Sequence, residues 1–182
     1  MIKNRLLIQA LGTKLMKILY WPFCISITIA IVSLGGCSSY VNNRLFDAKA
    51  KAITTLSDNH VQVIQRGEHV RLIIPSDYLF VFNSARIKPK ANPVLNEVAN
   101  LINEYAAHPV SVVIKASTDR IGSKEFKENR SLQQARHVAA YLWRHGVHHS
   151  QLKVIGRADT HPISANTVVG EAHNRRVEIT LW

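Results

Sequence analysis

From residue 61 onward, the order of apolar and polar residues predicts a succession of strands and helices. Apolar residues alternate with polar ones on both sides of Arg66-Gly67-Glu68, as expected of a β-hairpin with a short turn. Pro75 ends this hairpin. Residues 79–82 are another short apolar segment, which we expect at the edge of a strand. The alternating apolar residues of the hairpin are Val61, Val63, Val70, Leu72 and Ile74.

Two later segments repeat apolar residues at intervals of three and four, which is the period of a helix. The first starts at Pro93, which fits a first helical turn because its missing N–H is not needed there, and ends near residue 108. The second runs from about residue 127 to 145, with Gly146 past its end as a C-cap. The inward residues are Val94, Leu95, Val98, Leu101, Ile102 and Tyr105 in the first helix, and Ala135, Val138, Ala139 and Leu142 in the second.

Three more strands complete the pattern. Residues 110–114 form a nearly continuous β-branched run, typical of a strand covered on both faces, and residues 152–155 form another strand. Residues 177–182 alternate apolar with polar, which predicts a half-buried last strand after a short irregular or helical segment. The order predicts one α+β domain over residues 61–182, a two-layer sandwich with a mixed β-sheet and helices on one face.

The N-terminal segment has the layout of a secretory signal over residues 1–36. Four basic residues and no acid precede an apolar run over residues 18–34, which is shorter and more polar than the roughly 20 residues of a spanning helix. A retained transmembrane anchor is the alternative. Met16 begins a compact signal by itself, so we expect translation to start there.

Leu34-Gly35-Gly36-Cys37 resembles the lipobox of bacterial lipoproteins, in which the cysteine thiol takes a diacylglycerol. We therefore predict lipidation at Cys37, and Ser38 favours sorting to the outer membrane with the domain in the periplasm. Residues 37–60 are expected to form the lipidated N-terminus and a spacer with a weak helix. Cys24 lies in the removed segment, so no internal disulfide is expected.

Charge and motifs narrow the function further. The chain has a net charge of +11, which suits an anionic partner such as lipid head groups or cell-wall polymer, or serves solubility alone. An exported protein is not expected to bind nucleic acid. His145, His148 and His149 are interpreted as surface residues because Gly146 breaks the helix between them. We predict no catalysis, no metal site and no cofactor, since no nucleophile elbow, phosphate-binding loop or paired carboxylates occur.

Four motifs in order resemble the OmpA-like C-terminal domain of peptidoglycan-associated lipoproteins, outer-membrane proteins and flagellar stator proteins. The resemblance covers residues 61–182 and implies an OmpA-like sandwich that binds the stem peptide of peptidoglycan through its diaminopimelate residue. The motifs are Phe80-Val81-Phe82-Asn83-Ser84-Ala85, Ser117-Thr118-Asp119-Arg120-Ile121-Gly122, the series Gly156, Pro162, Asn166, Thr167 and Gly170, and Asn174-Arg175-Arg176-Val177-Glu178-Ile179.

The resemblance implies that Asp119 binds the zwitterionic head of diaminopimelate, unless it only caps its own turn. The arginine that pairs with this aspartate in the family stands fifteen residues later, where this chain has Gln134. Arg130 lies one helical turn earlier and could restore the cation, since residues four apart share a helix face. Alternatively, the pocket has decayed, because losing a charged hydrogen bond costs about 1.5 to 3 kcal/mol.

Further members of the implied site are Arg175 and Arg176, of which one is expected to hold the aspartate loop. The alternative for them is a salt bridge at the edge of the last strand. Asn83, Ser117 and Thr118 could donate neutral hydrogen bonds to the peptide, or serve ordinary turn chemistry.

Together these features predict an outer-membrane lipoprotein that tethers peptidoglycan without catalysis. A short lipoprotein with a weakened OmpA-like motif also resembles a lipoprotein of the Dot/Icm type IVB secretion system. Its expected partners are therefore the stem peptide, the outer membrane through the lipid on Cys37, and other envelope or secretion-complex proteins. The alternative is a structural subunit of the secretion core whose pocket does not bind peptidoglycan.

Overall fold

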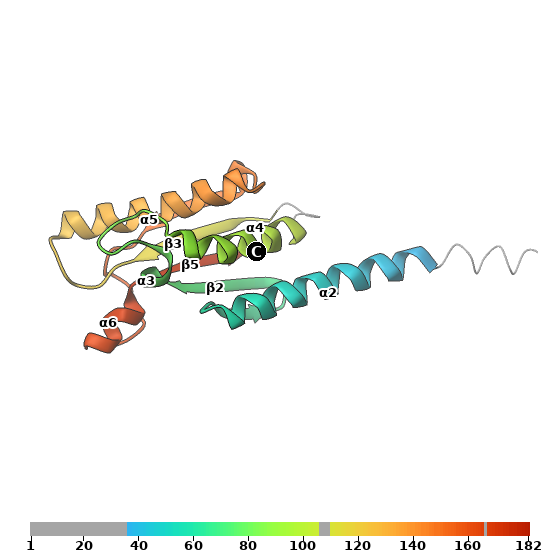
Figure 1. The fold of residues 1–182 in the computed structure, drawn as a ribbon, viewed down its shortest axis with the longest axis horizontal. Coiled ribbons are helices and arrows are strands. Elements are labelled where there is room, and N and C mark those ends of the chain that lie inside the picture. The colour runs from blue at the N-terminus through green and yellow to red at the C-terminus, as the bar shows by residue number, and fades with distance from the viewer. Residues whose placement is uncertain (1–35, 106–109, 166) are drawn as a thin grey trace, which may run out of the picture. The chain divides into compact units, whose positions relative to one another are not determined.

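The computed structural model describes residues 36–105, 110–165 and 167–182 (Figure 1). The predicted signal peptide lies almost entirely in residues 1–35, outside the described residues. One compact unit spans Asp47–Trp182, and the buried apolar residues of the main core cluster all belong to it. This unit therefore contains a complete core of its own.

The unit is built on a five-stranded mixed sheet with the strand order β1-β2-β5-β3-β4. Neighbouring strands are antiparallel except β3 and β4, which are parallel. This arrangement confirms the predicted mixed sheet. The strands are β1 (Gln62–Arg66), β2 (His69–Pro75), β3 (Val112–Ser117), β4 (Leu152–Gly156) and β5 (Arg176–Leu181).

The predicted hairpin is confirmed, with Arg66 opposite His69 across a two-residue turn. Gly67 has a φ of 59°, a conformation that glycine adopts without steric cost. The piece expected at a strand edge over residues 79–82 is reduced to one isolated bridge between Phe80 and Ile87, because α3 (Ser76–Leu79) forms a single helical turn just before it. The turn buries the Leu79 side chain completely in the core, which local alternation could not reveal.

Both predicted helices are confirmed as α4 (Asn92–Tyr105) and α5 (Lys124–Arg144), and every residue expected to face inward is buried. A short 3-10 helix, η1 (Pro89–Ala91), leads into α4. Ser123 caps α5 by accepting a hydrogen bond from the Phe126 N–H, and Gly146 follows its end with a φ of 96°. Figure 1 shows α4 and α5 in the helical layer of the two-layer fold.

The last strand differs from its predicted half-buried state. Val177, Ile179 and Leu181 face the core as expected, but Arg176 and Glu178 on the other face are buried too. β5 is the middle strand of the sheet, and the backbone near His161 closes over Arg176. Before β4 and β5 lie η2 (His149–Gln151) and α6 (Val168–Asn174), the latter in the segment predicted as irregular or helical.

The segment predicted as a spacer forms α2 (Gly36–Asp58). Within the compact unit, Ala52 and Leu56 on this helix are buried in the core, and the Lys49 ammonium lies 3.9 Å from the centre of the Tyr105 ring. The end of the predicted spacer is thus part of the folded unit. Among the helices of the described residues, none has the length and apolar character needed to cross a membrane.

Candidate functional site

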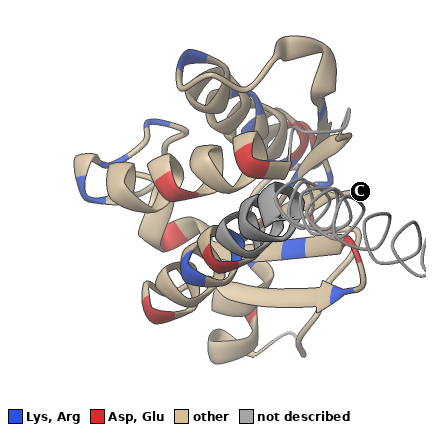
Figure 2. Ribbon diagram, turned by 90° about the vertical axis from the view of Figure 1, so that its right-hand side faces the viewer, with Lys and Arg blue, Asp and Glu red and all other residues tan. Residues whose placement is uncertain are grey.

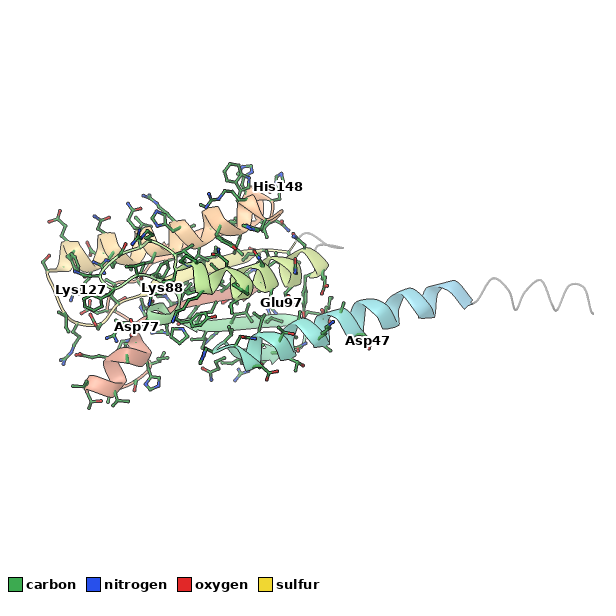
Figure 3. The ribbon with its side chains drawn as sticks, in the orientation of Figure 1. Asp47, Asp77, Lys88, Glu97, Lys127 and His148 are labelled. Atoms are coloured by element: carbon green, nitrogen blue, oxygen red, sulfur yellow. The ribbon has the colours of Figure 1, made fainter. Side chains whose placement is uncertain are left out.

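A cavity of about 340 Å³ opens at the end of the sheet where β3 finishes and β5 begins. Figure 3 shows Asp77, Lys88 and Lys127, three of its lining residues, at this same end of the domain. Its walls come from α3, the loop after α3, the loop after β3 and the first half of α5. The lining residues include Ser76, Asp77, Phe82, Asn83, Ser84, Lys88, Ser117, Thr118, Asp119, Ile121, Phe126, Lys127, Arg130, Gln134 and Arg175.

One wall of the cavity holds Arg175 between two carboxylates. Its Nη1 donates to Asp119 Oδ2 at 3.0 Å, and its Nε and Nη2 donate to Asp77 at 3.1 and 2.6 Å. The Asp77 and Asp119 carboxylates raise the pKa of Arg175 further above its usual range, the bond to Asp77 contributing most. Arg175 therefore stays protonated and fixes the Asp119 loop, the role expected of one of the two arginines.

Asp119 also shapes its own loop, because its Oδ1 accepts a hydrogen bond from the Ile121 N–H at 3.2 Å. The two interpretations of this residue, turn former and cavity residue, are therefore compatible. Its side chain is 14% exposed and lines the cavity. A carboxylate held in this way can accept a hydrogen bond from an ammonium group in the cavity.

The opposite wall is one face of α5 that holds the loop after α3. Arg130 Nη2 donates to Asn83 Oδ1 at 2.7 Å, and Gln134 Nε2 donates to the Ser84 carbonyl at 3.4 Å. One helical turn further, His137 Nδ1 contacts the Ala85 carbonyl. Because residues three and four apart share a helix face, Arg130 lies in the same cavity wall as Gln134.

Four residues that line the cavity each have a buried polar atom without a hydrogen-bond partner within the described protein. These atoms are Ser76 Oγ, Ser117 Oγ, Thr118 Oγ1 and Gln134 Oε1. Buried polar atoms in folded proteins are nearly always paired, and an unpaired one costs about 1 to 3 kcal/mol. The residues of this cavity wall therefore carry hydrogen-bonding groups that the described protein itself does not use.

Two lysines in the cavity wall have partners of their own. Lys127 Nζ lies 2.6 Å from Asp159 Oδ2, and this hydrogen bond lowers the pKa of Asp159. Lys88 Nζ donates to the Asp77 carbonyl at 2.7 Å. The ion pair with Asp159 offsets the charge of Lys127 in the cavity wall.

The cavity entrance is apolar. Phe82, Ile121 and Phe126 line the cavity and are 92%, 67% and 43% exposed. The Arg130 guanidinium lies 4.6 Å from the centre of the Phe126 ring, which orients this cation at the entrance. The arrangement suits a ligand that carries both charges on a polar head and has an apolar neighbour.

Arg176 is the predicted site residue that the structure does not bring to the cavity. It is 2% exposed, and its Nε and Nη2 donate to Glu178 Oε1 at 2.8 and 2.6 Å. Backbone carbonyls of Asn174 and His161 accept two further hydrogen bonds. All three of its side-chain nitrogens donate to protein groups, so the structure places Arg176 away from the cavity, in a salt bridge on the last strand.

The other predicted site residues of the domain, Asn83, Thr118, Asp119, Arg130, Gln134 and Arg175, lie together in the cavity wall. Cys37 lies in the part of α2 outside the compact unit. Sequence reasoning missed Ser76, Asp77 and His137. The spacing of Arg130, Gln134 and His137 on one helix face could have indicated His137, whereas nothing in the sequence pairs Asp77 with Arg175. Within the described residues, no three His, Cys, Asp or Glu side chains gather as metal ligands.

Comparison with known proteins identifies relatives of this chain. Curated relatives include the probable lipoprotein YiaD of Escherichia coli K12, 33% identical over 148 residues that cover 81% of this chain and 65% of the relative. Outer membrane protein A of Citrobacter freundii is 31% identical over 94 residues, covering 52% of this chain and 40% of the relative. The chain thus spans less than two thirds of the length of these relatives.

Solved structures share the fold. The cell wall anchor of the T6SS from Pseudomonas aeruginosa is 26% identical with a TM-score of 0.62, covering 73% of this chain and 95% of that one. The peptidoglycan-associated lipoprotein of Burkholderia pseudomallei is 20% identical with a TM-score of 0.52, covering 58% of this chain and 88% of that one. The OmpA family model matches residues 79–176, which include the cavity residues from Phe80 to Arg175. The chain therefore belongs to the OmpA family.

Proposed function

We propose that this protein is an outer-membrane lipoprotein whose OmpA-like domain binds peptidoglycan non-covalently, without catalysis. The observation that carries the proposal is the cavity itself. It combines the fixed carboxylate of Asp119, the cation of Arg130 and four buried polar atoms without partners. A stem-peptide diaminopimelate head, with one ammonium and one carboxylate, can pair with both charges.

In this proposal Arg130 takes over the role of the arginine that Gln134 replaces. Asn83 and Phe126 hold the Arg130 guanidinium at the cavity, and Gln134 offers its unpaired Oε1 beside it. A guanidinium can bind a carboxylate through two parallel hydrogen bonds, whereas a glutamine amide cannot supply the charge. The cation is thus shifted by one helical turn rather than lost.

The proposed cellular location and the proposed assembly rest on other features of the chain. Cys37 is proposed to carry the lipid, and Ser38 to direct the protein to the outer membrane with its domain in the periplasm. The similarity to a protein described as the cell wall anchor of a secretion system supports a place in such an envelope-spanning machine. We propose a type IVB secretion apparatus, on the sequence resemblance described above.

A second candidate function is a structural subunit with a degenerate cavity. Gln134 favours it, because its amide already donates to the Ser84 carbonyl and so has a structural role in holding the loop. In that case the domain would contact other secretion proteins and leave peptidoglycan unbound.

Sedimentation with purified sacculi tests the proposal. The fragment 38–182 retains the whole compact unit and lacks the lipidated cysteine. We expect the wild type to pellet with sacculi, and Asp119→Asn and Arg130→Gln to lose about tenfold or more in affinity, since each removes a charged hydrogen bond of about 1.5 to 3 kcal/mol.

Matched controls on exposed parts of α5 are Glu125→Gln for the aspartate and Arg136→Gln for the arginine, which make the same charge changes outside the cavity. They should pellet like the wild type. A wild-type fragment that stays in the supernatant would refute peptidoglycan binding and favour the structural subunit.

A further inference from the structure

The sheet has a second face that the helical layer does not cover. Successive side chains of a strand point to opposite faces, and Val70, Leu72 and Ile74 of β2 are buried on the helix side. Arg71 and Ile73 therefore lie on the other face, which we call the open face. Strand pairing places Thr180, Val113 and Lys153 in one row with Arg71.

The open face collects the charged residues of the sheet, and nearly all of them are cations. Arg66, Arg71, Lys115, Lys153 and Arg176 lie on the strands, and Arg157 follows directly after β4. The five strands contain one acidic residue, Glu178. In Figure 2 the helices carry both blue and red positions, so this one-sided charge is a property of the sheet.

Glu178 alone balances only part of this charge, because its carboxylate is shared between two arginines. Its Oε1 lies 2.6 Å from Arg176 Nη2 and 3.6 Å from Arg157 Nη1, and the residue is 5% exposed. Burial lowers the pKa of Lys115 most and Arg157 lowers it next; Glu178 opposes this shift, and Arg71 and Lys153 add to it. The cations of the open face therefore repel one another.

Apolar side chains lie between these cations. Ile64, Ile73 and Ile155 are partly exposed, and Trp182, which continues the alternation of β5, is 47% exposed. Val113 is buried under its neighbours on this face without joining the main core cluster. Cations, isoleucines and a tryptophan on one surface are typical of proteins that lie at a membrane interface.

We propose that the open face docks on an anionic membrane surface, with Arg66, Arg71, Lys115 and Lys153 against lipid phosphates. The cations are carried on long side chains on strands about 5 Å apart, so they present a broad positive field. A lipid surface offers many mobile phosphates, each of which can meet a cation without one fixed geometry. The cavity does not include these residues, so this docking is separate from the peptidoglycan site.

Vesicle co-sedimentation of the fragment 38–182 tests this inference, because the fragment has no acyl anchor and contains the complete core. We expect binding to vesicles of phosphatidylcholine with phosphatidylglycerol and none to phosphatidylcholine alone. Binding should weaken strongly with salt, since the Debye length falls from about 10 Å at 0.1 M to about 3 Å at 1 M. A wild-type fragment that does not co-sediment with the anionic vesicles would overturn the proposal.

The double variant Arg71→Gln/Lys153→Gln removes two exposed cations of the open face and should weaken vesicle binding roughly thirtyfold. Its matched control is Arg136→Gln/Arg144→Gln on exposed positions of α5, which changes net charge equally. Equal losses in both variants would show attraction by net charge alone and overturn the assignment to the open face.

Two further readouts separate membrane docking from other outcomes. In a Trp143→Phe background, Trp182 is the one tryptophan of the fragment, and its fluorescence should shift to the blue on anionic vesicles. Binding of polyglutamate without binding of vesicles would instead identify an acidic protein partner and overturn the membrane proposal. Asp119→Asn, which affects the cavity, should leave vesicle binding unchanged, so failure of one proposal leaves the other intact.

Discussion

Arg175 and Arg176 are neighbours in the sequence, yet the fold gives their guanidinium groups different surroundings. Arg175 lines the cavity, with two carboxylates as partners and neighbouring polar atoms that lack any. Arg176 is buried, and its donors are paired with Glu178 and two backbone carbonyls. Arg175 thus lies beside a cavity whose wall has unused hydrogen-bonding groups, whereas the guanidinium of Arg176 is enclosed by its own partners.

This difference separates the domain into two kinds of region. Where polar groups are satisfied internally, as around Arg176, a substitution should change the free energy of unfolding and affect binding only through it. Where they are left unpaired, as in the cavity, a substitution should change binding with little effect on stability. The predictions below test this separation, beginning with the largest effect.

Arg176→Met should lower the free energy of unfolding by about 3 kcal/mol or more, because it leaves Glu178 buried with only the longer contact to Arg157. Denaturant unfolding measures this loss. The double variant Arg176→Met/Glu178→Leu should recover much of it, since replacing a whole buried pair is often nearly neutral. A single variant as stable as the wild type would show that the pair has no structural role.

Gly156→Ala should lower the free energy of unfolding by about 1 to 3 kcal/mol. A Cβ atom at Gly156 would lie 2.7 Å from the Leu132 N and 2.8 Å from Ser131 Oγ, so α5 must move away from β4. Ser131 Oγ also accepts the hydrogen bond of the Ala158 N–H, which that movement strains. Lys153→Ala, at an exposed position on the same strand, is the control and should leave stability nearly unchanged.

The fold was largely predictable from the sequence, because apolar periodicity follows burial directly. Local pattern predicted the inward residues of α4 and α5, the hairpin turn at Gly67 and the order of strands and helices along the chain. The apolar–polar alternation did not predict that β5 is buried on both faces, or that residues 79–82 contain the end of a helical turn and one isolated bridge. Glu178 looked solvent-exposed because its buried partner Arg176 and the covering loop are set by tertiary structure.

The site was predictable where the family motif placed a residue and unpredictable where distant residues meet. Asp119 and Arg130 were found from motif and helix spacing, and both lie in the cavity wall. The Asp77–Arg175 pair joins residues 98 positions apart, and no local rule relates them. The unpaired polar atoms of Ser76 and Gln134 could not be predicted either, because their identification requires the burial of each side chain in the folded structure.

Moving the cation along α5 tests whether Arg130 replaces the arginine absent at Gln134. Arg130→Gln should weaken sacculus binding about tenfold, the loss of one charged hydrogen bond. The swap Arg130→Gln/Gln134→Arg returns the guanidinium to the position that the family uses and should restore at least part of the affinity. The free energy of unfolding should change by less than about 1 kcal/mol in Arg130→Gln, because this side chain is partly exposed. A swap variant that binds sacculi no better than Arg130→Gln would contradict the hypothesis that Arg130 replaces the arginine absent at position 134.

The smallest expected effect is a pH dependence of stability from the Lys127–Asp159 pair beside the cavity. The hydrogen bond from Lys127 lowers the pKa of Asp159 in the folded state, so the pair stabilises the fold above the unfolded pKa of about 3.9 and this contribution is lost as pH falls through the lowered value. The contribution should be at most about 1 kcal/mol, since Asp159 is partly exposed. Denaturant unfolding of wild type and Asp159→Asn from pH 6 to pH 3 should show two curves that converge on acidification, and parallel curves would mean that the pair contributes nothing to stability.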